Sequence, residues 1–145
     1  MRTTILAMFM AIALSVATVP ARAGQTAMTV YKSPTCGCCQ IWATYMRKQG
    51  FDVTIRDIEN MGKIKARFGI QDDLQACHTA VVGKYVVEGH MPVEAINALL
   101  AKNPEVKGIS LPGMPVGSPG MPGPKAEPFR IFTLTDGTPE LFMEM

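Results

Sequence analysis

The sequence predicts an α/β domain in which helices flank a mixed β-sheet. Short β-prone segments alternate with stretches whose apolar residues recur at helical spacing. Two short β-prone segments separated only by Gly83 are typical of a β-hairpin. The length of residues 24–145, which follow an expected export signal, suits one small domain with one core.

The first half of this domain is expected to contain two strands and two helices. β-Branched, aromatic and alternating apolar residues predict strands at residues 27–32 and 51–58. Apolar residues at helical spacing predict helices at residues 40–49 and 61–68, and a glycine follows each of them.

The second half is expected to begin with the hairpin, formed by strands at residues 79–82 and 84–88. A helix should follow, with Pro92 near its first turn and an apolar face that includes Ile96 and Leu99. The resulting order is strand, helix, strand, helix, hairpin, helix. This order predicts a thioredoxin-like domain.

Residues 108–128 differ from the rest because proline and glycine dominate them. Such a stretch is not expected to form a helix or an inner strand. A linker to a second domain is one interpretation, but too few residues follow it to form one. We therefore expect a long loop, rich in proline, glycine and methionine, that packs back on the domain. Alternation resumes at residues 129–134 and predicts an extra C-terminal strand, followed by a turn at Asp136–Gly137.

The N-terminus has the pattern of a cleavable export signal at residues 1–23. Arg2 is followed by an apolar run at residues 5–19, and small residues at Ala21 and Ala23 predict cleavage before Gly24. A retained membrane anchor is the alternative, but the run is shorter than the roughly 20 residues that span a bilayer. We expect a periplasmic protein, with residues 24–145 as a single domain that does not associate with the membrane.

The charge pattern gives no reason to expect nucleic acid or anionic lipid as a partner. The full chain has 14 basic and 12 acidic residues. Removal of the signal would take Arg2 and Arg22 with it, so the two signs would then balance. Scattered charges without a basic cluster do not predict binding to polyanions.

The four cysteines are Cys36, Cys38, Cys39 and Cys77. In an exported protein, two structural disulfides are the first interpretation. However, the neighbours Cys38 and Cys39 could form only a strained disulfide with each other. In addition, three sulfurs within four residues are more typical of a functional site than of two structural disulfides. The spacing therefore favours a metal or redox site.

The cysteine run lies where a strand ends and a helix begins, and the free N–H groups of a helix start stabilise thiolates. Cys36 and Cys39 have the C-x-x-C spacing of thiol oxidoreductases. In a thioredoxin-like domain the residues just before the third strand face this helix start, and thioredoxins carry a cis-proline there. This chain has Cys77 and His78 instead, so we expect Cys77 to join the other three cysteines.

A thiolate-rich site favours soft metal ions, and adjacent cysteines favour Cu(I), with zinc as the second choice. His78 beside Cys77 is a further candidate ligand. It could instead form a hydrogen bond to one of the ligands without binding the metal itself. Met114 and Met121 in the loop offer soft sulfur, but could equally anchor the loop by apolar contact. His90 could cap a helix or lie near the site, and the sequence favours the first role.

Four motifs together resemble the CopG-like family of small exported proteins: Cys36–Cys39, Cys77–Ala80, Gly89–Pro92 and the Gly-Met-Pro loop. The resemblance extends from about Met28 to Thr135. It implies a thioredoxin-like fold, a periplasmic location, an association with copper resistance and a copper site formed by the four cysteines. One departure is Met91, where a β-branched residue is expected.

Three functions follow as hypotheses. The first is copper binding for tolerance, in which the protein sequesters Cu(I) or transfers it to another periplasmic copper-handling protein. The second is a thiol–disulfide oxidoreductase in which Cys36 attacks and Cys39 resolves. The third couples disulfide chemistry at the cluster to copper reduction.

Overall fold

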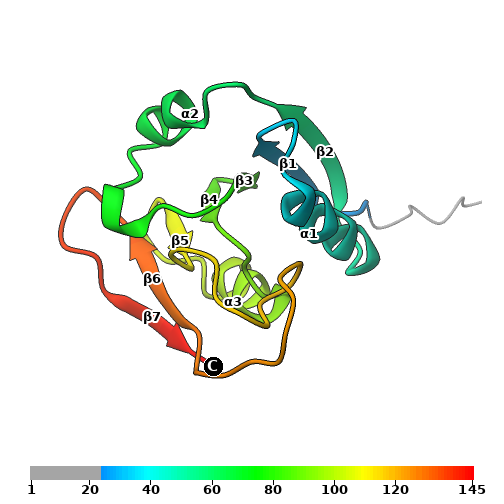
Figure 1. Ribbon diagram of the computed structural model, residues 1–145. Helices are drawn as coiled ribbons and strands as arrows, with labels where there is room; N and C mark the ends of the chain where they lie inside the picture. The colour runs from blue at the N-terminus through cyan, green and yellow to red at the C-terminus, as the bar shows by residue number, and fades with distance from the viewer. Residues whose placement is uncertain (1–23) are drawn as a thin grey trace, which may run out of the picture.

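The computed structural model describes residues 24–145, so the expected export signal and its cleavage point lie outside the described residues. Within them, one seven-stranded mixed sheet has the strand order β2-β1-β3-β4-β5-β6-β7 (Figure 1). The strands are β1 (Ala27–Lys32), β2 (Asp52–Asp57), β3 (Thr79–Val82), β4 (Tyr85–Glu88), β5 (Gly108–Ser110), β6 (Arg130–Leu134) and β7 (Leu141–Glu144). The helices are α1 (Gly37–Lys48), α2 (Met61–Arg67), α3 (Val93–Lys102) and a short 3-10 helix, η1 (Asp72–Leu74).

The first part of the chain has the predicted order of elements. β1 pairs in parallel with β2 and antiparallel with β3, and β3 forms a hairpin with β4. This arrangement confirms the predicted α/β class and is compatible with a thioredoxin-like domain. α1 begins at Gly37, earlier than expected, because the Cys36 side chain caps the helix by accepting a hydrogen bond from the Cys39 N–H.

The core lies between the sheet and the apolar faces of α1 and α3. Trp42 and Met46 of α1 and Ile96 and Leu99 of α3 are fully buried in it. Each such side chain contributes roughly 1.5–3 kcal/mol through its burial. The Trp42 indole N–H donates to the Met91 carbonyl at 2.9 Å, which ties α1 to the segment that leads into α3.

The expectation that residues 108–128 contain no inner strand is wrong. Gly108–Ser110 forms β5, which lies between β4 and β6 and is buried. Its glycine is required by close packing, because a Cβ at Gly108 would lie 1.7 Å from the Val86 carbonyl oxygen. The prolines that exclude a strand begin only at Pro112.

The C-terminal end extends the sheet further than expected. The predicted added strand is present as β6, and residues after the predicted turn form a further strand, β7, antiparallel to it. Three strands beyond the hairpin therefore enlarge the domain on one side.

The expected long loop covers residues 111–128, drawn yellow to orange in Figure 1. The Gly113 N–H donates to the Gln75 carbonyl at 3.1 Å, and the Pro119 carbonyl lies 2.8 Å from His90 Nδ1. The prediction that this stretch packs back on the domain is confirmed.

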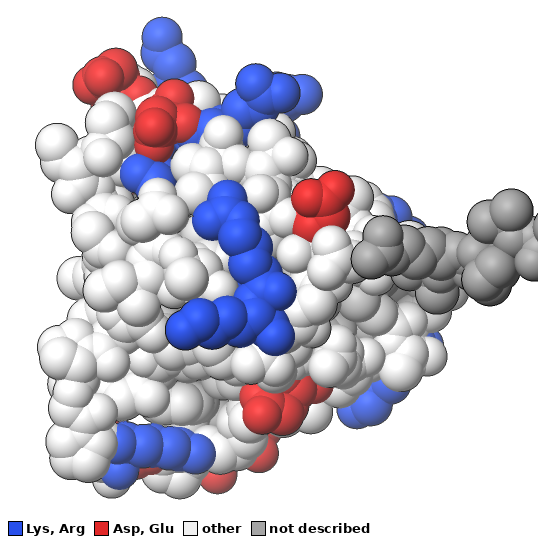
Figure 2. Space-filling view, turned by 90° about the vertical axis from the view of Figure 1, so that its right-hand side faces the viewer, with Lys and Arg blue, Asp and Glu red and all other residues white. Residues whose placement is uncertain are grey.

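Basic and acidic side chains are interspersed on the face shown in Figure 2, with uncharged surface between them. Among residues 24–145 no helix combines the length and the apolar character needed to cross a bilayer.

Candidate metal centre

The strand order explains why the distant cysteine joins the other three. β1 and β3 are antiparallel neighbours, and Tyr31 near the end of β1 pairs with Thr79 at the start of β3. The turn that follows β1 and the segment that precedes β3 therefore emerge at the same edge of the sheet. The first carries Cys36 into α1, and the second carries Cys77.

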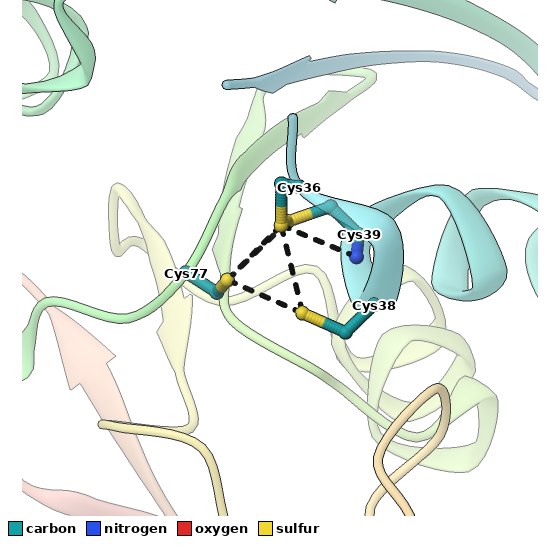
Figure 3. Close-up of side chains that lie close together, drawn as sticks. All are labelled: Cys36, Cys38, Cys39 and Cys77. Carbon is teal, nitrogen blue, oxygen red and sulfur yellow. Dashed lines mark hydrogen bonds between the residues drawn. A yellow bond between two sulfur atoms is a disulfide. The ribbon is translucent and has the colours of Figure 1, made fainter. Parts of the chain in front are cut away.

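The four sulfur atoms form one compact group (Figure 3). Cys77 Sγ lies 3.2 Å from Cys36 Sγ, 3.6 Å from Cys38 Sγ and 3.3 Å from Cys39 Sγ. Cys36 Sγ and Cys38 Sγ are 3.5 Å apart. The prediction that Cys77 lies beside the cysteine run is confirmed.

Cys36 and Cys39 form a disulfide, whereas Cys38 and Cys77 are free thiols. The bonded pair has the C-x-x-C spacing, and the Cys39 N–H points at Cys36 Sγ over 3.4 Å. Cys39 is fully buried, while the other three cysteines are partly accessible. The group thus borders solvent on one side and the protein interior on the side of Cys39.

Cys77 keeps its proton at neutral pH. Burial, together with the hydrogen bond and the charge of Cys38, raises the pKa of the Cys77 thiol to about 11. A metal ion that binds Cys77 must therefore displace this proton.

A buried ion pair holds the segment that carries Cys77. The Glu88 carboxylate, fully buried on β4, pairs with Lys65 of α2. Its Oε1 also accepts the Ala76 N–H at 2.7 Å, and its Oε2 accepts the Thr79 hydroxyl at 2.6 Å. Glu88 thus holds the backbone of Ala76 and the side chain of Thr79, on either side of Cys77. The sequence analysis missed this role, although a glutamate that ends the otherwise apolar strand Tyr85–Glu88 was a signal for it.

Both histidines lie beneath the cysteines, in the interior. The buried His78 ring packs against Trp42 and His90, with ring centroids 4.4 Å and 4.9 Å away. Among residues 24–145, neither ring nitrogen of His78, nor Nε2 of His90, has a hydrogen-bond partner. One nitrogen of each ring and Cys39 Sγ lie within 4.8 Å of one another. The sequence favoured a capping role for His90 away from the site; the structure places it at the site.

Burial favours the neutral form of both imidazoles. Burial lowers the pKa of His78 well below its usual value, and the charges of His90 and Lys65 lower it further. Burial also lowers the pKa of His90, partly offset by its hydrogen bond to Pro119. A neutral imidazole has a nitrogen lone pair available for a metal ion.

The loop backbone reaches both cysteine segments, but the methionine sulfurs have no established contact with them. Gly113, just before Met114, pairs with Ala76. Gly120, just before Met121, packs so closely on α1 that a Cβ there would lie 2.9 Å from the Cys38 carbonyl oxygen. Met114 is exposed and Met121 is partly buried. A ligand role for either methionine stays a prediction.

Comparison with known proteins places the chain in a family. A family model described as a protein of unknown function, DUF411, matches residues 74–121, the region with Cys77, both histidines and both loop methionines. No curated protein gives a significant match. Two solved structures, both described as copper resistance protein CopG, in forms 2 and 1, have TM-scores of 0.77 and 0.76. Each is 33% identical, and the match covers 83% of this chain and 98% of the other. The chain therefore belongs to the family of the CopG copper resistance proteins.

Proposed function

We propose that the protein binds Cu(I) through the four cysteines and thereby contributes to copper tolerance, by sequestering the ion or passing it to another copper-handling protein. The observation that carries this proposal is the convergence of four sulfurs from two distant segments, with Cys77 Sγ 3.2–3.6 Å from each of the other three. All four sulfurs can act together as ligands only after the Cys36–Cys39 disulfide is reduced, because the thiolate is the metal ligand.

The donor set fits copper. Two sulfurs that bind one ion at about 2.3 Å each lie roughly 3.8 Å apart in a tetrahedral site, so the spacing between Cys77 and the other three sulfurs requires little change once the disulfide is reduced. Sulfur ligands prefer soft ions, and adjacent cysteines allow a thiolate to bridge two of them. Zinc is the competing ion for the same sulfurs. The copper resistance proteins to which the chain is similar favour copper.

His78, Met114 and Met121 complete the proposed set of metal-binding residues. His78 adjoins Cys77 and has two ring nitrogens without partners. The thioethers lie on a loop whose backbone touches both cysteine segments, a place suited to transient capture of a soft ion.

A second function is favoured by the Cys36–Cys39 disulfide at the start of α1. Oxidation of the two thiols to this disulfide releases two protons and two electrons, which would reduce two Cu(II) ions to two Cu(I) ions. The cysteines left free, Cys38 and Cys77, would then hold the product. In this function the protein is a copper-coupled oxidoreductase, and the same pair could alternatively exchange disulfides with a protein substrate.

We place this activity in the periplasm. The support is the sequence of residues 1–23, which has the charge, apolar run and small residues of a cleaved signal. Fractionation of cells that express the full chain, with mass determination of the periplasmic form, tests it: the mature protein should begin at Gly24.

Two assays separate the functions. Reduced protein should take up Cu(I) in competition with a chelator and should bind it more tightly than Zn(II). Reduction of insulin disulfides should be weak, because Cys77 occupies the place where thioredoxins dock their substrates. If zinc binds more tightly, the copper assignment is wrong; if insulin is reduced efficiently without metal, disulfide exchange is the main activity.

A further inference from the structure

We propose that Lys32 is a positioning residue for the cysteine group: it holds the turn that carries Cys36, so that the Cys36 sulfur faces Cys77 before any metal binds. The inference rests on the proposed function and deepens it, because it names a residue that is not a ligand and yet determines how well the ligands are placed. Lys32 acts through the backbone of the turn.

The burial of Lys32 is the first support. Its side chain, at the end of β1, is only 5% exposed. Lysine is almost never buried unless its ammonium group is paired. Lys32 Nζ lies 2.7 Å from Asp57 Oδ1, and Asp57 is the residue opposite Lys32 on β2. Because Asp57 is itself 55% exposed, this ion pair could form at the surface, and the burial of the lysine points to a further contact.

The further contact is with the turn between β1 and α1. Lys32 Nζ donates to the Ser33 carbonyl at 3.1 Å and also lies 3.5 Å from the Pro34 carbonyl. The Ser33 carbonyl accepts a second hydrogen bond, at 3.0 Å, from the Cys36 N–H. This second bond closes a four-residue turn with proline at its second position, as is common in β-turns. One carbonyl oxygen therefore joins the ammonium group of Lys32 to the backbone of Cys36.

The turn determines the position of the Cys36 sulfur, because Cys36 is also the N-cap of α1. Its Sγ faces the Cys39 N–H over 3.4 Å, which fixes the side chain relative to the helix. In this position Cys36 Sγ lies 3.2 Å from Cys77 Sγ. A turn that is free to move would therefore carry the Cys36 sulfur away from Cys77.

A second buried lysine has the same relation to the opposite segment. In the described part of the chain, the buried basic side chains are those of Lys32 and Lys65. Lys65 pairs with Glu88, whose Oε1 also accepts the N–H of Ala76, next to Cys77. In both segments, one oxygen joins a buried ammonium group to a backbone N–H at or beside a cysteine. This repetition indicates that the buried lysines hold the two facing segments in place.

The first test needs no metal. When Cys38→Ser and Cys39→Ala are combined, Cys36 and Cys77 are the two thiols that remain. In a glutathione buffer they can form a disulfide, with two electrons and two protons passing to oxidised glutathione, which becomes two molecules of reduced glutathione. The equilibrium gives the effective concentration of one thiol at the other. This quantity reports the placement of the two sulfurs and not the overall stability of the fold.

Lys32→Met is the main variant in this background. It keeps a long apolar side chain, and it leaves Asp57 exposed to water, so no buried charge loses its partner. We expect the effective concentration to fall by at least about 10-fold, the lower limit for loss of a residue that orients a ligand. Lys84→Met is the matched control, because Lys84 forms an ion pair with Glu105 on the surface; it should leave the effective concentration unchanged.

Asp57→Asn is the second variant, and it decides the question if Lys32→Met does not fold. Without its counter-charge, the Lys32 ammonium group should turn toward water and release the turn. The effective concentration should then fall in the same direction, by a smaller factor. If both variants keep the effective concentration of the background protein, and only the melting temperature changes, Lys32 is purely structural and the proposal is wrong.

Copper binding provides the link to function. In protein with all four cysteines, Lys32→Met should weaken Cu(I) binding by about 10- to 100-fold, as is typical of residues that orient a ligand. Wild-type affinity in this variant would mean that Lys32 does not position the ligands, which would overturn the proposal. If the wild-type protein binds no copper at all, the proposed function is wrong, whereas the thiol measurement still decides the role of Lys32.

Discussion

Replacement of Cys77 by serine should be the most damaging single change to copper binding. Cys77 Sγ lies 3.2, 3.6 and 3.3 Å from the sulfurs of Cys36, Cys38 and Cys39. Cys38 Sγ, in contrast, contacts only those of Cys36 and Cys77. The loss of Cys77 thus removes the one donor that comes from outside the start of α1 and that touches every other sulfur.

The size of the effect can be bounded. Loss of a residue that merely supports a ligand costs about 10- to 100-fold in metal affinity. A direct ligand shared by the group should cost more, so we expect Cys77→Ser to weaken Cu(I) binding by at least about 100-fold, equivalent to roughly 2.8 kcal/mol. Cys38→Ser should have a smaller effect. Competition of reduced protein against a coloured Cu(I) chelator measures both.

The fold should not account for this loss. Cys77 is partly accessible and is not in the disulfide, so the melting temperature of the metal-free variant should stay close to that of the wild type. A Cys77→Ser protein that is folded and binds copper with wild-type affinity and stoichiometry would refute the idea of a single shared group.

Three further predictions follow from other parts of the molecule. Glu88→Gln leaves Lys65 without its buried counter-charge and should destabilise the protein by about 3–5 kcal/mol in denaturant unfolding; a change below about 1 kcal/mol would mean that the pair does not hold the Cys77 segment. Gly108→Ala places a methyl group against the backbone of β4 and should cost about 3 kcal/mol, with a lower melting temperature as the readout and unchanged stability as the contrary result. Met114→Leu and Met121→Leu keep apolar volume but remove soft sulfur, so they should slow copper transfer to a chelator and leave the bound stoichiometry unchanged; loss of a bound ion would instead make a methionine a permanent ligand.

The position of Cys77 could be predicted because it depends on strand order. Once β1 and β3 are antiparallel neighbours, the residue before β3 must approach the start of α1. Local patterns and the known order of a thioredoxin-like domain were sufficient for that step. The boundaries of β3 and the path of the hairpin followed from the same local signals.

Features that depend on contacts between distant segments were not predictable. β5 is short, and Gly108 alone predicts the end of a strand. The need for glycine at this position is clear only from the close approach of β4. The ring of His90 is oriented at the site by a contact with the Pro119 carbonyl, which belongs to a long irregular loop. Glu88 is acceptable inside the protein because Lys65 reaches it from α2. No local sequence pattern indicates any of these contacts between distant residues.

The most direct test of the central claim is elemental analysis with X-ray absorption spectroscopy on protein purified without oxygen from the periplasm of copper-fed cells. The account predicts copper as the bound metal, in the Cu(I) state, with cysteine sulfur as its main neighbour, and loss of that copper in Cys77→Ser. Protein that carries zinc in place of copper, or that holds no metal although its cysteines are reduced, would contradict it.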